Sequence, residues 1–175
     1  MRLFVSLPII GQLEQQLKTL PRKGLNAEWV HPKDYHITLR YLGDADIEQL
    51  EDIKQSLKRI KTKSFGIEIE GLSHFDAKNG AILYANVQSK RKITALAAEI
   101  NLKMQRNGFE MPNKPFVPHI TVAKMVSARD LNGYLRANNK KIRASWRASG
   151  FELVESGDLA DNMPRYKILQ RYDLQ

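Results

Sequence analysis

The sequence predicts an α+β fold built on antiparallel sheet. Segments that alternate as strands do are interspersed with segments of helical periodicity, and several strands follow one another directly, as in hairpins. The order loop, strand, helix occurs twice, each time around the tripeptide His-Ile-Thr, at residues 36–38 and 119–121. Hairpin connections favour antiparallel pairing over a doubly wound parallel sheet. The repeat indicates one domain, residues 1–175, with two related halves.

The first part of the chain is expected to hold two strands and two helices. Residues 2–7, RLFVSL, form the first strand, and a helix ended by Pro21 follows it. The apolar residues of this helix are Leu13, Leu17 and Leu20. Residues 29–44 end in a strand, after which Asp44 or Asp46 caps the second helix. Its apolar residues, at helical spacing, are Ile47, Leu50, Ile53, Leu57 and Ile60.

The middle of the chain predicts a hairpin and a long helix. Strands are expected at residues 65–72 and 81–87, joined around the Asn-Gly turn signal at residues 79–80. A helix follows over residues 92–107, with Gly108 as its C-terminal stop. Its apolar stripe consists of Ile93, Leu96, Ile100 and Met104.

The last part repeats the earlier order. A proline-rich loop leads into the strand that begins at His119, and a short helix capped by Ser127 follows. The apolar residues of that helix are Leu131 and Leu135. Two final strands, at residues 145–154 and 166–173, flank a polar loop at residues 158–164.

Composition indicates an ordinary globular protein. Hydrophobic residues make up 42% of the chain and charged residues 27%, enough apolar material for a core. No apolar run approaches the roughly 18 residues of a membrane helix, so we expect no membrane span. The opening apolar stretch is broken by Pro8 and lacks a small-x-small cleavage site, which favours a strand over a signal peptide. The chain has no cysteine, which fits a reducing compartment, and we expect a cytoplasmic protein.

The net charge of +9 is concentrated in the second half of the chain. Residues 1–87 hold 12 Lys and Arg against 11 Asp and Glu, whereas residues 88–175 hold 16 against 8. A basic half suits an anionic ligand, although basic excess also occurs in proteins that bind no nucleic acid.

Two of the four histidines lie in the same local string, His36-Ile37-Thr38 and His119-Ile120-Thr121. Only 5 of 175 residues are threonine, so two chance coincidences would have a probability of about 0.5%. In a strand, residues i and i+2 share a face, so each imidazole projects beside a hydroxyl while the isoleucine between them points into apolar packing. If the repeat reflects a structural duplication, a pseudo-two-fold axis would bring both pairs around one small ligand.

Such a site suits displacement at phosphorus. One imidazole can take a proton from the attacking oxygen while the other protonates the leaving oxygen. The hydroxyls of Thr38 and Thr121 can donate hydrogen bonds to the non-bridging oxygens. A strained five-membered cyclic phosphate needs no metal for this chemistry, and we expect neither a metal site nor a cofactor.

These motifs resemble those of the two-histidine phosphoesterase superfamily, and more closely its RNA 2′,3′-cyclic phosphodiesterase branch, also described as 2′-5′ RNA ligases. The likeness runs over nearly the whole chain, in the segments RLFVSLPI (2–9), WVHPKDYHITLRYLGD (29–44), FVPHITVAK (116–124), FELVESGD (151–158), Tyr166 and YDL (172–174). The resemblance implies a bilobal fold with two antiparallel sheets around a cleft and helices outside. It also implies that His36 donates a proton to the leaving 3′-oxygen, that His119 activates water, and that the product carries a 2′-phosphate.

Two positions depart from the family pattern. Lys124 stands where relatives often have arginine, which keeps the charge but loses bidentate phosphate geometry. Gly80-Ala81 stands where a basic residue is common. Both departures affect the expected substrate preference more than the reaction. We regard Lys124 and Phe116 as possible substrate contacts, Phe116 because it precedes His119 by three residues in a loop that can border the cleft.

Other interpretations compete with this one. His36 and His119 could be structural residues of their strands. We expect His31 to be a surface residue and His74 to be a structural residue. Metal binding is disfavoured because no H-E-x-x-H or H-x-x-E-H string occurs. A nucleotide- or RNA-binding module without turnover, and RNA joining as the reverse reaction, remain open. We expect a monomer whose partner is an RNA or oligonucleotide with a 2′,3′-cyclic phosphate end.

Overall fold

The computed structural model describes residues 1–175 except residues 24, 79, 127 and 158–164. Over the described residues, the strands form one nine-stranded sheet in the order β7-β4-β5-β6-β3-β1-β8-β9, with the short β2 paired to β6. All of its pairings are antiparallel. The predicted α+β class with antiparallel sheet is therefore confirmed.

The helices and strands follow one another largely in the predicted order. The strands are β1 (Arg2–Pro8), β2 (Glu28–Trp29), β3 (His36–Asp44), β4 (Phe65–Ala77), β5 (Gly80–Val87), β6 (His119–Val126), β7 (Arg143–Ala148), β8 (Gly150–Ser156) and β9 (Tyr166–Asp173). The α-helices are α1 (Gln12–Lys18), α2 (Ile47–Lys58), α3 (Lys90–Arg106) and α4 (Ala128–Asn138), and the 3-10 turns are η1 (Pro32–Asp34) and η2 (Asn139–Lys141). None of the described helices has an apolar stretch long enough to cross a bilayer.

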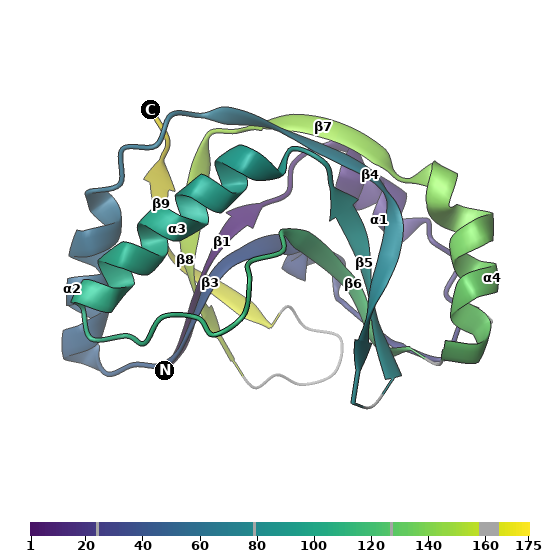
Figure 1. The fold of residues 1–175 in the computed structure, drawn as a ribbon, viewed down its shortest axis with the longest axis horizontal. Coiled ribbons are helices and arrows are strands. Elements are labelled where there is room, and N and C mark those ends of the chain that lie inside the picture. The colour runs from purple at the N-terminus through teal and green to yellow at the C-terminus, as the bar shows by residue number, and fades with distance from the viewer. Residues whose placement is uncertain (24, 79, 127, 158–164) are drawn as a thin grey trace.

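The sheet consists of two four-stranded halves that meet between the two His-Ile-Thr strands. Strands β7, β4, β5 and β6 form one half, and β3, β1, β8 and β9 form the other, as Figure 1 shows on its right and left sides. The expectation of two separate sheets is corrected here, because β3 and β6 pair antiparallel through Ile37 and Ile120 and so make the sheet continuous. Both isoleucines are fully buried, so this joint belongs to the core.

The helices lie outside the sheet and link the halves. Helix α3 contacts α2 and β3, while α1 contacts β7 and α4 contacts β4 (Figure 1). The side-chain amide of Gln16 in α1 donates to the main-chain oxygen of Arg143 at 2.8 Å and accepts from its N–H at 2.9 Å. An N-terminal helix is thus attached to a C-terminal strand, which makes the two halves interdependent.

The helix ends largely follow the local sequence signals. Asp46, and not Asp44, caps α2, and it forms a reciprocal capping box with Gln49. Ile47, predicted to lie on the apolar stripe, is 74% exposed because it is the first residue of the helix. Gly108 follows α3 with a φ of 85°, a left-handed conformation that suits a helix end. The predicted turn at residues 79–80, the Ser127 cap and the polar loop at 158–164 fall wholly or partly outside the described residues.

One predicted strand is wrong. Residues 145–154 form two strands in opposite halves, since β7 pairs with β4 and β8 pairs with β1. The break falls at Ser149, whose carbonyl accepts a hydrogen bond from Leu174 N–H at 2.8 Å. A Cβ on Gly150 would lie 2.8 Å from the main-chain oxygen of Tyr172, so glycine permits the close approach of β8 to β9. The chain therefore crosses from one half to the other with a single residue, Ser149, between the two strands.

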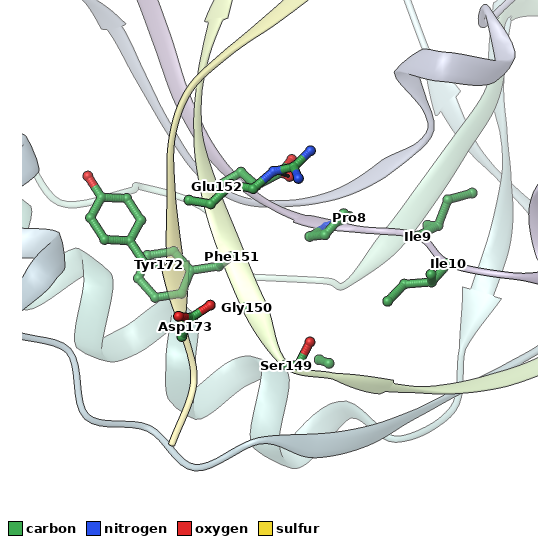
Figure 2. A pocket seen from close by; sticks show the side chains of 11 residues that line it. Pro8, Ile9, Ile10, Ser149, Gly150, Phe151, Glu152, Tyr172 and Asp173 are labelled. Atoms are coloured by element: carbon green, nitrogen blue, oxygen red, sulfur yellow. Dashed lines mark ion pairs between the residues drawn. The ribbon is translucent and has the colours of Figure 1, made fainter.

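A cavity of about 340 Å³ lies beside this crossing, and Figure 2 shows the side chains that line it. Phe151 stacks on Tyr172 at a centroid separation of 4.9 Å, and the guanidinium of Arg171 pairs with Glu152 at 2.9 Å. Burial raises the pKa of Glu152, and the charge of Arg171 opposes that shift. The ion pair of Glu152 and Arg171 also lines the cavity beside His36, so it separates that cavity from the one beside Ser149.

Candidate active site

His36 is the first residue of β3 and is separated from the turn η1 by Tyr35 alone. Its Nδ1 lies 2.7 Å from the main-chain oxygen of Asp34, and its Nε2 lies 2.9 Å from the hydroxyl of Thr38. A carbonyl oxygen only accepts, so Nδ1 carries the proton and Nε2 is the nitrogen available for proton transfer. In the neutral ring, Nε2 accepts a hydrogen bond from the hydroxyl of Thr38.

His119 begins β6 and is held in the same way. Its Nδ1 lies 2.7 Å from the main-chain oxygen of Val117, again two residues earlier in the chain. The same reasoning leaves Nε2 of His119 as the reactive nitrogen. Both imidazoles are thus fixed in one tautomer by a carbonyl of the loop that precedes the strand.

The pairing of β3 with β6 brings the two motifs together. Ile37 lies opposite Ile120 in an antiparallel ladder, so one step along each strand places His36 toward Thr121 and Thr38 toward His119. Cross-strand neighbours share a face, and both isoleucines point into the core. The four predicted site residues therefore share one face at the joint of the sheet.

Lys124 reaches this face because β6 contains a bulge. Between the pairs Tyr84–Thr121 and Leu83–Ala123, β5 advances by one residue and β6 by two. Val122 and Ala123 are consequently both fully buried, and Lys124 is exposed on the side of Thr121. Its charge is close enough to lower the pKa of His36.

Each imidazole is flanked by two aromatic rings. His36 has centroid separations of 4.9 Å to Phe4 and 5.2 Å to Tyr166. Around His119, the corresponding separations are 5.0 Å to Phe75 and 5.4 Å to Tyr84. The sequence alone does not place these four rings beside the histidines, because their proximity depends on strand order and register. Tyr166 was noted only as part of the family likeness.

The electrostatic environment of His36 favours its neutral form. Burial is the main cause that lowers the pKa of His36, and the charges of Lys124 and His119 add to the lowering. The hydrogen bond to Asp34 and the charge of the Asp34 carboxylate act in the opposite direction. The proton affinity of His36 is therefore set by a balance that a bound anion would change.

A second cavity opens beside Thr38 and His119, with a volume of about 440 Å³. Its wall includes the predicted contact Phe116, together with the cationic side chains of Arg40 and Lys114. Phe116 is half-buried and packs against the core, so the loop presents it in a fixed place. A third cavity of about 180 Å³ adjoins His36 and is lined by residues that include Phe4, Asp34 and Tyr166.

The other two histidines lie in different settings. His31 caps η1, with its Nδ1 accepting from the N–H of Lys33 at 3.2 Å. The Nε2 of His74 lies 3.8 Å from the carboxylate of Asp76, which is almost fully exposed. Within the described residues, no three His, Cys, Asp or Glu side chains are grouped so that they could hold a metal ion.

Comparison with known proteins places this arrangement in a class. The fold matches the crystal structure of Escherichia coli LigT complexed with 3′-AMP, with a TM-score of 0.82, 23% identity and coverage of 99% of this chain and 97% of that one. The family model described as the 2′-5′ RNA ligase superfamily matches residues 12–159. The chain belongs to the 2′-5′ RNA ligase superfamily, which confirms the resemblance inferred from the two motifs.

Curated relatives refine this placement. An RNA 2′,3′-cyclic phosphodiesterase from Aquifex aeolicus is 31% identical over 134 residues, 73% of this chain and 71% of that protein. The enzyme of the same name from Thermotoga maritima is 26% identical over 132 residues, 71% of this chain and 70% of that protein. These names support the enzyme class expected from the sequence, a phosphoric diester hydrolase.

Proposed function

We propose that this protein hydrolyses the 2′,3′-cyclic phosphate at the end of an RNA to a 2′-phosphate by two-histidine acid/base catalysis without a metal. One observation carries the proposal. His36 and His119, each with Nδ1 bonded to a main-chain carbonyl, share a face of the sheet with Thr38 and Thr121. The names of the curated relatives supply the substrate class.

The reaction needs both imidazoles in opposite protonation states. Nε2 of neutral His119 takes a proton from water as its oxygen attacks phosphorus, and the bond from phosphorus to the 3′-oxygen breaks. Nε2–H of protonated His36 gives its proton to the departing 3′-oxygen, leaving a 3′-hydroxyl and a 2′-phosphate. Proton exchange between the two histidines and solvent then restores the starting state. The hydroxyls of Thr38 and Thr121 donate to the non-bridging oxygens throughout.

Substrate binding would charge the proton donor. Burial lowers the pKa of His36, whereas a proton donor must be protonated. An anionic phosphodiester beside Nε2 favours the imidazolium form and offsets the charge of Lys124. The hydroxyl of Thr38, which accepts from Nε2–H when His36 is charged, is released to bind a phosphate oxygen once the substrate takes its place.

The nucleoside part of the substrate has a suitable place in the 440 Å³ cavity. Thr38 and His119 belong to its wall, so a phosphate held by them stands at its mouth. Phe116 and the exposed Tyr41 offer rings on which a base can stack. Lys124, on the other strand, provides a single-point contact to the phosphate.

The two halves support an internal duplication. Each half has four strands with its His-Ile-Thr strand innermost, so β3 corresponds to β6 and β1 to β5. Each imidazole has a carbonyl two residues earlier and two aromatic neighbours. We infer a pseudo-two-fold relation between them within one two-lobed domain. All four site residues come from one chain, so the monomer is the unit that we expect to act.

The test is turnover of an RNA oligonucleotide with a 2′,3′-cyclic phosphate end in the presence of EDTA. We expect full activity and a 2′-phosphate product. Loss of activity that a divalent metal restores would contradict the mechanism. A 3′-phosphate product would show that the bond from phosphorus to the 2′-oxygen breaks, and not the bond to the 3′-oxygen. Binding without turnover would favour the binding module, and a joined product with a 5′-hydroxyl RNA would show the reverse reaction.

A further inference from the structure

The carboxylate of Asp34 is buried beside the candidate proton donor. Asp34 ends η1 and is only 4% exposed, an unusual position for an aspartate side chain. Its two carboxylate oxygens accept hydrogen bonds from the main-chain N–H of Arg165, at 3.1 and 3.0 Å. Its own main-chain oxygen accepts from Nδ1 of His36. One residue therefore contacts both the imidazole and a chain segment 131 residues away.

The segment held by the Asp34 carboxylate forms a wall of the site. Arg165 directly precedes Tyr166, the first residue of β9. The ring of Tyr166 meets the ring of His36 edge-on, with an interplanar angle of 85°. Asp34, His36 and Tyr166 line the same 180 Å³ cavity. Loss of the carboxylate would free the start of β9 from the turn that carries His36.

The second half-site has the carbonyl but not the carboxylate. Val117 occupies the position of Asp34, two residues before the histidine, and its main-chain oxygen makes the matching bond to Nδ1 of His119. The side chain of Val117 is apolar and 43% exposed. Both histidines therefore have their tautomer fixed by a main-chain carbonyl. Of the two, only His36 has a buried carboxylate two residues before it.

We propose that Asp34 is a positioning residue for His36. The main-chain carbonyl of Asp34 fixes the His36 imidazole. The carboxylate of Asp34 anchors the start of β9 beside His36 and supports the protonated form of the imidazole. This role rests on the proposed function, in which His36 must carry a proton at the start of the reaction. A negative charge in a region of low dielectric stabilises a nearby imidazolium. Val117 leaves His119 without that support, as suits a proton acceptor.

Other charged groups also face His36, and the role of Asp34 must be measured against them. From β6, Lys124 and His119 oppose its protonation, and burial acts in the same direction. Tyr166 faces it from β9, where burial and then the charge of Asp34 raise the pKa of that phenol. The remaining titratable or charged side chains of the cavity wall are Glu14, Lys33, Tyr35, Glu152 and Arg171. Among these groups, Asp34 is the one hydrogen-bonded to the imidazole through its main chain.

The experiment separates the charge of Asp34 from its hydrogen bonds. Asp34→Asn keeps an oxygen that can accept from Arg165 N–H and keeps the carbonyl, but it removes the charge. Titration of the His36 imidazole by NMR should show a pKa lower in Asp34→Asn than in the wild type, with kcat reduced on the order of tenfold and KM little changed. Asp44→Asn, which removes an exposed carboxylate at the far end of the same strand, is the matched control. An unchanged titration of His36 in Asp34→Asn would overturn the proposal.

A second variant transfers the carboxylate to the other half. Val117→Asp places a negative charge two residues before His119, at an exposed position that tolerates it. Because His119 must be neutral to accept a proton, kcat should fall below neutral pH and recover as the pH rises. Equal effects of Asp34→Asn and Val117→Asp at every pH would contradict the assignment of different roles. The NMR titration requires no turnover, so failure of the proposed hydrolysis remains distinguishable from failure of this inference.

Discussion

The half-site around His36 and the half-site around His119 are built alike but placed in different surroundings. Each has an imidazole fixed by a carbonyl two residues earlier, a buried isoleucine behind it and two aromatic rings beside it. His36 is also bonded to Thr38 and lies next to a buried carboxylate, and burial lowers its pKa. His119 faces the larger cavity that includes Phe116.

This difference shows that a repeated motif gives both copies the same geometry, while the neighbours of each copy set its electrostatic environment. The His-Ile-Thr strings are identical, so nothing within them distinguishes a proton donor from a proton acceptor. The residues that differ between the two copies, Asp34 and Val117, lie in the segments that precede the two strands. Substitutions that affect one half more than the other are therefore the most informative.

The largest effects are expected from the imidazoles. His36→Ala and His119→Ala should each lower kcat by about 10²–10⁴-fold, because each removes one of the two proton transfers. The double variant should lose less than the product of the single losses, since acid and base act as a unit. Steady-state hydrolysis of a 2′,3′-cyclic end measures this, with His74→Gln as a control. Nearly wild-type rates in either single variant would remove that histidine from the mechanism.

The threonines should show the asymmetry between the halves. Thr38→Val and Thr121→Val should each lower kcat/KM by about 10–10³-fold through lost hydrogen bonds to phosphate. We expect the smaller loss for Thr38, because its hydroxyl must give up the 2.9 Å hydrogen bond to Nε2 of His36 before it binds phosphate. Thr→Ser at either position retains the hydroxyl and should restore most of the rate. Equal losses at the two positions would show that the bond to His36 has no role in turnover.

The cavity beside His119 predicts a smaller effect on substrate binding. Phe116→Ala should raise KM about tenfold with kcat little changed, a size consistent with the loss of one base–aromatic stack. Phe116→Tyr, which retains a ring, is the matched control. Measurements on a cyclic mononucleotide suffice, because the contact is to the base itself. A fall in kcat at constant KM would place Phe116 in positioning of His119 and not in base binding.

The smallest effect concerns the dependence of stability on pH. Burial lowers the pKa of His36 below its ordinary value of 6.5, so the folded state prefers the neutral ring. The unfolded chain then binds more protons below pH 6.5, and the free energy of unfolding decreases as the pH falls from 6.5 through the folded pKa. His36→Gln should weaken this decrease. Denaturant unfolding curves across that range provide the measurement, and identical pH dependence in both proteins would contradict it.

Local sequence patterns sufficed for most elements and for the centre of the site. The alternation of residues 2–7, the spacing in α2 and α3, and the repeated motif depend only on near neighbours along the chain. Residues 145–154 differ from the prediction because only one residue separates β7 from β8, while the partner strand changes from β4 to β1. The joining of the two halves into one sheet depends on the contact of Ile37 with Ile120, which no local pattern reveals.

The site residues that sequence reasoning missed all depend on long-range contacts. Phe4 and Tyr84 face the histidines through strand register, and Asp34 acts through Arg165, far along the chain. An aspartate after Pro32-Lys33 has an obvious local explanation as a turn residue, so the sequence does not indicate its contact with Arg165. Only the folded arrangement distinguishes a turn residue from a neighbour of the His36 imidazole.

The two halves of the sheet are completed at different times while the chain is synthesised. Strands β1 and β3 are made early, but the half to which they belong also needs β8 and β9 from the end of the described chain. A nascent chain that stops before Arg165 carries both histidines, yet lacks the N–H that the Asp34 carboxylate binds and the ring of Tyr166 beside His36. Translation therefore delivers the surroundings of His119 first. The ribosome must synthesise nearly the whole described chain before the environment of His36, the proposed proton donor, exists.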